Sequence, residues 1–153
     1  MTGEGDYGPT TCPVLAALPH RAPFLLVDRV VACEAGRWVR ATRLLTAGDP
    51  LLPGGGAGAL PAPLLIEAVA QAAAALLLSA RPDAVPALLG VDHAAFPGEC
   101  ALPPVRAHAG DTLHLYAEVR WLRRRVGRAR GAATLGAADG PVLCDALFTF
   151  GLL

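Results

Sequence analysis

A carboxylate and an amide lie one helical turn apart inside the most apolar segment of the chain. Glu67 and Gln71 interrupt the sequence LPAPLLIEAVAQAAAALLLSA, residues 60–80. Residues four positions apart share one face of a helix, so both side chains would point the same way. A carboxylate among apolar residues is usually paired or functional. Glu67 is therefore a candidate site residue, with a tolerated polar residue at a helix end or interface as the alternative.

A carboxylate that transfers protons to or from a substrate usually works with a second acid or base, and histidine is the commonest one. No histidine occurs between His20 and His93. His93 falls in a continuous apolar run, residues 87–96, which we interpret as a buried strand. It is the candidate for a second catalytic residue, and a core or interface histidine bonded to backbone is the simpler alternative. His108 and His114 are predicted to lie at the surface.

The loop before the apolar segment contains a glycine run, GGGAG, at residues 54–58. It lacks the GK[ST] ending of a phosphate-binding loop. We interpret it either as a flexible loop or as backbone that approaches a ligand closely, because glycine leaves room for such an approach. On the second interpretation, Gly55 and Gly56 are candidate substrate-binding residues.

The composition predicts one compact domain, with 54% hydrophobic and 17% charged residues and a formal net charge of zero over 153 residues. Residues 1–11 are predicted as a flexible tail and residues 12–153 as the domain. The N-terminus lacks the basic and apolar regions of a signal peptide. The apolar run after Gln71 falls short of the roughly 20 residues of a membrane span. We therefore expect a cytoplasmic protein without membrane contact.

Neither the cysteines nor the basic residues form a known binding motif. Cys12, Cys33, Cys100 and Cys144 contain no CxxC pair, so we predict free buried thiols, no metal and no cofactor. Six arginines lie between positions 120 and 130, in RWLRRRVGRAR. Because the net charge is zero and no nucleic-acid motif accompanies them, we predict a solvated strand face or a protected sheet edge, and no nucleic-acid binding.

Hydrophobic periodicity predicts one long helix and several antiparallel strands. A short helix at 12–18 and the long helix at 63–79 are expected, with strands at 24–31, 37–45, 87–96, 110–122, 126–135 and 141–150. Two strands alternate clearly, and each is predicted to carry one apolar face: Leu113, Leu115, Ala117, Val119 and Trp121 in the first, and Val142, Cys144, Ala146, Phe148 and Phe150 in the second. A helix that is hydrophobic all round needs a sheet that curls around it. This predicts an α+β fold, an antiparallel sheet wrapped around one long central helix.

Three segments resemble, in order, the FabZ/FabA-like 3-hydroxyacyl-(acyl carrier protein) dehydratases, a family with the hot-dog fold. LPHRAPFLLVDRV at 18–30 is similar to the N-terminal signature of the family, and LLIEAVAQAAA at 64–74 to the start of its central helix. GVDHAAF at 90–96, followed by AGDTLHLYAEV at 109–119, is similar to the strand after the helix and to the GD turn into the long strands. The resemblance covers the chain from about residue 12 onward.

The resemblance implies a homodimer, or a hetero-oligomer with another hot-dog subunit, whose substrate is an acyl thioester on acyl carrier protein or CoA. In the family, a histidine of one subunit removes a proton from the α-carbon. A glutamate on the partner's central helix assists departure of the β-hydroxyl as water. Glu67 corresponds to that glutamate, and Gln71 to the glutamine one turn later, here a candidate substrate-binding residue. His20 corresponds to a histidine that is not catalytic in the family, so a structural hydrogen-bonding role is predicted for it.

The catalytic histidine of the family has no counterpart in this chain. It belongs to a GHFPxxPxxPG loop, where this chain has LLPGGGAGALPAP at 51–63. Pro53 or Gly55 takes its position, and neither residue can act as a base. Three functions stay open. The chain is a dehydratase of fatty-acid or polyketide biosynthesis that uses Glu67, a non-catalytic partner of an active dehydratase, similar to aryl-polyene-type dehydratase-like proteins, or an acyl thioesterase that uses Glu67.

Overall fold

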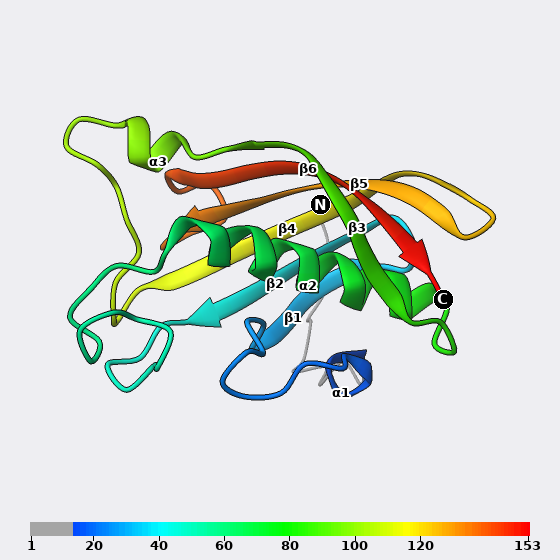
Figure 1. Cartoon of the computed structure of the whole chain (residues 1–153), viewed down its shortest axis with the longest axis horizontal. Coiled ribbons are helices and arrows are strands. Elements are labelled where there is room, and N and C mark those ends of the chain that lie inside the picture. Colours follow the sequence, from blue (N-terminus) through cyan, green and yellow to red (C-terminus); the bar gives the residue numbers. More distant parts are fainter. Residues whose placement is uncertain (1–13) are drawn as a thin grey trace, which may run out of the picture.

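A curled antiparallel sheet wraps around one long helix in the computed structural model, which describes residues 14–153 (Figure 1). Its six strands follow the order β1-β2-β4-β5-β6-β3, and each neighbouring pair is antiparallel. The strands are β1 (Arg29–Glu34), β2 (Trp38–Leu44), β3 (Pro86–Ala95), β4 (Thr112–Arg123), β5 (Val126–Leu135) and β6 (Val142–Leu152). The helices are α1 (Val14–Ala17), α2 (Ala62–Ala80) and α3 (Pro97–Cys100). The predicted α+β hot-dog architecture is confirmed. The predicted tail at 1–11 and Cys12 lie outside the described residues.

Helix α2 forms the centre of the core. Its alanines and leucines are strong helix formers, and Pro63 occupies the first turn, where its missing N–H needs no partner. By length and composition α2 could cross a membrane, so the argument from a short apolar run does not hold. Instead, more than half of its most apolar stretch is buried inside the described fold. Helix α2 is thus the core helix of a packed domain.

A glycine in β5 lets the helix approach the sheet closely. A Cβ atom added at Gly131 would lie 2.2 Å from Cγ1 of Val69 on α2 and 2.7 Å from the carbonyl oxygen of Tyr116. Atoms cannot approach that closely without displacement, and Val69 is fully buried. The position therefore requires a residue without a side chain, and it sets the distance between α2 and the middle of the sheet.

The predicted alternation in β4 and β6 is confirmed over most of each strand. Leu113, Leu115 and Ala117 of β4 are buried against the helix side of the sheet. Trp121, predicted on the same face, is 43% exposed, because the β4–β5 register shifts between Val119 and Trp121. One inserted residue in a ladder disrupts its regular alternation. In β6, Val142 at the start of the strand is exposed, and the other residues of the predicted apolar face, Cys144, Ala146, Phe148 and Phe150, are buried.

Two strand predictions are wrong in their details. Strand β1 begins at Arg29, because the segment at 24–27 bonds to α2 instead of a neighbouring strand. Within residues 14–153, strand β3 is an exposed edge strand that pairs only with β6, although its apolar run predicted a buried strand. Leu88 and Leu89 are 45% and 57% exposed there. A continuous apolar run indicates that a strand tends to be covered. It does not indicate which element or which subunit covers it.

Four arginines of the run lie on β4 and β5, on a solvated strand face as one of the two alternatives predicted, and Arg124 and Arg125 lie in the turn between these strands. Strands β4 and β5 are interior strands of the sheet, so the protected-edge alternative is wrong. Three of the side chains form ion pairs across this face: Arg120 with Glu118, Arg130 with Asp145, and Arg128 with Asp92. Of the described cysteines, Cys144 is buried as predicted, whereas Cys33 and Cys100 are exposed.

Candidate functional site

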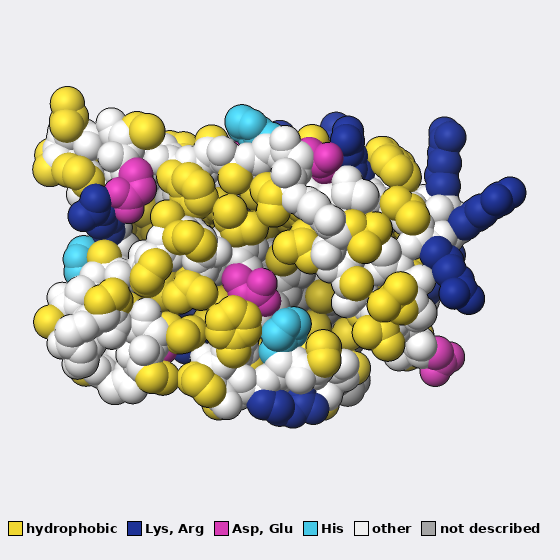
Figure 2. Space-filling model, viewed as in Figure 1, with side chains coloured by type: hydrophobic (Ala, Val, Ile, Leu, Met, Phe, Trp, Pro, Cys, Tyr) yellow, Lys and Arg dark blue, Asp and Glu magenta, His cyan; other side chains and the backbone are white. Residues whose placement is uncertain are grey.

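A largely apolar cavity of about 280 Å³ lies between α2, β3, β6 and the segment before β1. Figure 2 shows the corresponding face, where mainly hydrophobic side chains surround an acidic group and a histidine that lie side by side near the centre. The polar side chains of the lining are His20, Glu67 and Gln71. The others are Pro19, Ala70, Ala73, Ala74, Leu77, Pro86, Ala87, Leu88, Phe148 and Phe150. The fold thus places three polar side chains, His20, Glu67 and Gln71, in the lining of a cavity that is otherwise apolar.

Gln71 joins the N-terminal segment to the central helix. Its side chain is 1% exposed, and its Oε1 accepts a hydrogen bond of 2.7 Å from the backbone N–H of Leu26. Its Nε2 donates to the carbonyl oxygen of Phe24 and to Oε1 of Glu67, each at 2.8 Å. Buried polar groups need such partners, and both the oxygen and the nitrogen of this amide have them. Gln71 therefore holds in place both the segment FLL, residues 24–26, and the Glu67 carboxylate.

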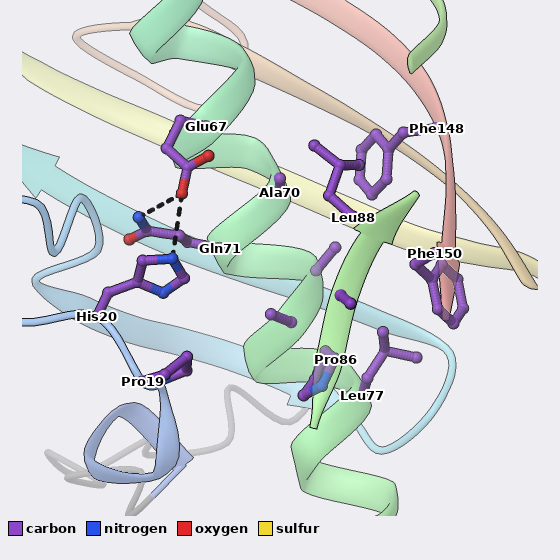
Figure 3. Close-up of a pocket in the computed structure, with 13 residues that line it drawn as sticks. Pro19, His20, Glu67, Ala70, Gln71, Leu77, Pro86, Leu88, Phe148 and Phe150 are labelled. Carbon is purple, nitrogen blue, oxygen red and sulfur yellow. Dashed lines mark hydrogen bonds and ion pairs between the residues drawn. The ribbon is translucent and has the colours of Figure 1, made fainter. Parts of the chain in front are cut away.

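Glu67 and His20 form a pair at the edge of the cavity (Figure 3). The imidazole Nε2 lies 3.4 Å from Oε1 of Glu67, and the two side chains are 31% and 26% exposed. Glu67 lies in the second turn of α2, and His20 comes from the segment between α1 and β1. A carboxylate and an imidazole in contact are groups that can transfer protons near neutral pH.

The structure brings His20 to the site, which the sequence analysis did not foresee. The two residues lie far apart in the sequence, and no spacing rule connects them. One cue was present: His20 stands four residues before Phe24, in the same signature that Gln71 binds. Because Gln71 also bonds to Glu67, that signature had to pass close to the carboxylate.

His93 lies outside the cavity lining. It belongs to β3, where it pairs through its backbone with Leu147, and it is exposed. His108 is exposed and His114 is partly buried on β4. In this single chain, His93 therefore does not meet Glu67, and its catalytic role stays a prediction that requires a neighbouring subunit or a rearrangement.

The glycines of the loop between β2 and α2 also lie outside the cavity lining. Gly55 and Gly56 have φ angles of 68° and 97°, values that favour glycine. A Cβ atom at Gly56 would lie 2.1 Å from the carbonyl oxygen of Ala47. The loop is anchored by Asp49, which is buried and forms an ion pair with Arg43. The glycines thus provide the positive φ angles and the close packing of a compact loop. Their role in substrate binding stays a prediction.

Comparison with known proteins identifies the family. The family model ApeP-like, described as ApeP dehydratase, matches residues 12–90. The 3-hydroxyacyl-(acyl-carrier-protein) dehydratase FabZ of Roseiflexus castenholzii is 34% identical over 143 residues, which cover 91% of this chain and 93% of that protein. The chain belongs to the FabZ-like dehydratase family. The FabZ of Bacillus subtilis is 33% identical to this FabZ-like chain over 139 residues, 88% of this chain and 92% of its own length.

Solved structures share the fold of this FabZ-like chain. The dehydratase heterocomplex ApeI:P from Xenorhabdus doucetiae matches with a TM-score of 0.72 and 21% identity, over 92% of this chain and 90% of that one. Zebrafish thioesterase superfamily member 2 matches with a TM-score of 0.66 and 15% identity, over 95% and 94%. At these identities the two solved structures bear on the fold alone, and they confirm the hot-dog fold.

This FabZ-like chain differs from the family pattern in its loop. The loop at 46–61 contains no histidine, and the histidine that does reach the cavity comes from the N-terminal segment. Within residues 14–153, no group of three or more histidine, cysteine or acidic side chains is arranged to hold a metal ion. The polar side chains of the cavity lining are Glu67 and the two residues that touch it, His20 and Gln71.

Proposed function

We propose that this chain takes part in the dehydration of 3-hydroxyacyl thioesters on acyl carrier protein, in fatty-acid or polyketide biosynthesis, with Glu67 as the site carboxylate. One observation carries the proposal: Glu67 is a hydrogen-bonded carboxylate at the edge of a largely apolar cavity. An apolar cavity suits an acyl chain, and the carboxylate suits the polar end of the substrate. Family membership supports the same reaction.

The reaction requires two proton transfers. A base removes the proton from C2, and the electron pair of that bond forms the C2–C3 double bond. The bond from C3 to the hydroxyl oxygen breaks, and the hydroxyl takes up a proton and leaves as water. We assign the second transfer, to the leaving hydroxyl, to Glu67. The family places the base at C2 in the loop, where this chain has no histidine, so the base stays unassigned, with His93 as its predicted candidate.

A second function follows from that gap: the chain is a partner subunit that supplies Glu67 to a shared site. Two observations favour it. The loop at 46–61 has no histidine, and within the described chain β3 presents an unpaired edge with exposed Leu88, Leu89 and Val91. Exposed apolar edges tend to be covered by pairing. Because Pro86, Ala87 and Leu88 also line the cavity, a hot-dog subunit paired there would close it and could bring its own histidine.

A basic end of the molecule is the expected docking place for an acyl carrier protein. Arg123, Arg124 and Arg125 lie in or beside the β4–β5 turn, and Figure 2 shows basic side chains projecting from that end of the molecule. Charge complementarity would favour an acidic carrier protein there over the rest of the surface. CoA thioesters remain the alternative substrate.

Turnover of short and medium 3-hydroxyacyl thioesters, followed by mass spectrometry, tests the proposal. We expect wild-type protein to form the enoyl product and the Glu67→Gln variant to form it about 10²–10⁴-fold more slowly, as for loss of an acid/base group. Glu99→Gln is the matched control, because Glu99 is an exposed carboxylate on α3 that pairs only with Arg106 in the described chain. Equal rates in both variants would contradict a role for Glu67.

The same assay separates the remaining functions. Product that forms only when a histidine-bearing hot-dog subunit is added, and that still requires Glu67, would support the partner function. Release of free acid in place of enoyl product would indicate a thioesterase. A His93→Gln variant tests the predicted second catalytic residue. Light scattering of a Leu89→Arg variant tests the assembly, because a charge at the β3 edge should break a pairing there.

A further inference from the structure

The two oxygens of the Glu67 carboxylate have different surroundings. Oε1 accepts the 2.8 Å hydrogen bond from Nε2 of Gln71 and lies 3.4 Å from Nε2 of His20. Figure 3 shows both contacts converging on this one oxygen. Among the described residues, Oε2 has no hydrogen-bond or ion-pair partner. It is also not buried. Oε2 is therefore accessible at the cavity.

The imidazole of His20 is equally asymmetric. Its Nε2 faces the carboxylate, whereas its Nδ1 is buried and has no hydrogen-bond partner in the described chain. A proton on Nδ1 would create a buried N–H without an acceptor, which is costly. A proton on Nε2 instead lies on the side of the ring that faces Glu67, whose Oε1 is 3.4 Å from that nitrogen, and it leaves an unbonded lone pair on Nδ1. The surroundings thus favour the Nε2–H form, with the imidazole as a donor.

This placement makes His20 unsuited to act as the base. The nitrogen lone pair that would accept a substrate proton is on Nδ1, and that atom is closed off from the cavity. Nε2, the nitrogen toward the site, is the one that must carry the proton to contact Glu67. The side chain also meets Phe24, whose ring centre lies 6.3 Å from that of His20. The same residue that Gln71 binds through its backbone therefore supports the imidazole.

We propose that His20 is a positioning residue that donates from Nε2 to Oε1 of Glu67, so that Oε2 is the oxygen that exchanges a proton with the substrate. The inference rests on the proposed dehydration and adds to it the working atom and its support. Gln71 and His20 both contact Oε1. Rotation of the carboxylate, which would exchange the two oxygens, would need both contacts to break.

Two substitutions of His20 distinguish a positioning role from a proton-transfer role. The amide nitrogen of Gln reaches the position of Nε2, whereas that of Asn reaches only the position of Nδ1. We expect His20→Asn to lower kcat by about 10- to 100-fold, the effect of losing a hydrogen bond to a charged group. We expect His20→Gln to recover most of that loss while the shape of the pH–rate profile is retained. His108→Gln, at an exposed histidine, is the control for the substitution itself.

Equal and large losses in His20→Gln and His20→Asn would overturn the proposal, because only a proton-transfer role requires the imidazole itself. Melting temperatures identify any variant that fails to fold. Nitrogen-15 NMR of the imidazole, assigned with His20→Gln, gives a second test that does not depend on turnover. At about pH 8, a proton on Nε2 whose signal moves in Glu67→Gln supports the inference. A proton on Nδ1 would overturn it, even if wild-type protein proves inactive and the proposed function itself fails.

Discussion

Nε2 of Gln71 donates to Oε1 of Glu67 across one turn of α2, while Oε1 of the same amide accepts from the backbone of Leu26. One buried side chain thereby connects the site carboxylate to the segment that carries His20. The connection shows how two separate segments, around residue 20 and around residue 67, contribute to one site. Each supplies half of one hydrogen-bonded unit.

The Gln71 unit should be important for stability as well as for the site. Gln71→Met keeps the length of the side chain but removes its hydrogen bonds, which leaves the Leu26 N–H and the Phe24 carbonyl without partners. We expect the free energy of unfolding to fall by about 2–4 kcal/mol, the cost of unsatisfied buried groups. Urea unfolding measures it. A loss within the roughly 0.5 kcal/mol typical of surface changes would show that water or rearrangement replaces these bonds.

Close packing between α2 and β5 predicts a large effect from one methyl group. In Gly131→Ala, the new Cβ would overlap Val69 and the Tyr116 carbonyl, so we expect a loss of about 1–3 kcal/mol in unfolding free energy. Gly48→Ala is the matched control, because its Cβ would meet nothing within 4 Å. Similar stabilities of the two variants in urea would mean that the helix can shift away from the sheet at little cost.

The cysteines should differ sharply in reactivity. Burial, with a smaller contribution from the neighbouring Asp145 carboxylate, raises the pKa of the Cys144 thiol to about 11. Because the thiolate is the reactive form, Cys144 should resist iodoacetamide at about pH 8 in the folded protein. Cys100 is exposed and should be alkylated under the same conditions. Peptide mass spectrometry with and without denaturant reads both sites. Alkylation of Cys144 at the rate of Cys100 in native protein would indicate frequent opening of the β6 side of the core.

Acid should weaken the outer face of the sheet through Glu118. Hydrogen bonds from Arg120 and then from Tyr116 hold the pKa of this carboxyl below its usual value of 4.5. A carboxyl with a lowered folded-state pKa contributes stability above its unfolded pKa, and the contribution is lost as the pH falls through the folded value. We therefore expect Glu118→Gln to be less stable than wild type near neutral pH, by up to about 1 kcal/mol. The difference should shrink below about pH 4.5 in urea titrations. A constant difference at all pH values would assign the effect to packing.

The order of the strands and the exposure of β3 show where sequence patterns stop. Alternation predicted the buried faces of β4 and β6, because the side-chain period of a strand is local. The same logic failed at Trp121, where a register shift changes which face the side chain takes. It also failed at β3, because the position of a strand within a sheet depends on pairing with residues distant in sequence.

The sequence by itself determined the hot-dog fold class, the central helix, and the shared face of Glu67 and Gln71. The central helix and the shared face follow from helical periodicity, and the hot-dog class follows from the resemblance of three short motifs to a known family. Only the tertiary structure decided that His20 is the histidine in contact with Glu67, and that His93, Gly55 and Gly56 lie away from the cavity of the same chain. Those placements depend on how α2, β3 and the segment before β1 pack together. Such packing is set by contacts between residues far apart in the chain, which no local pattern encodes.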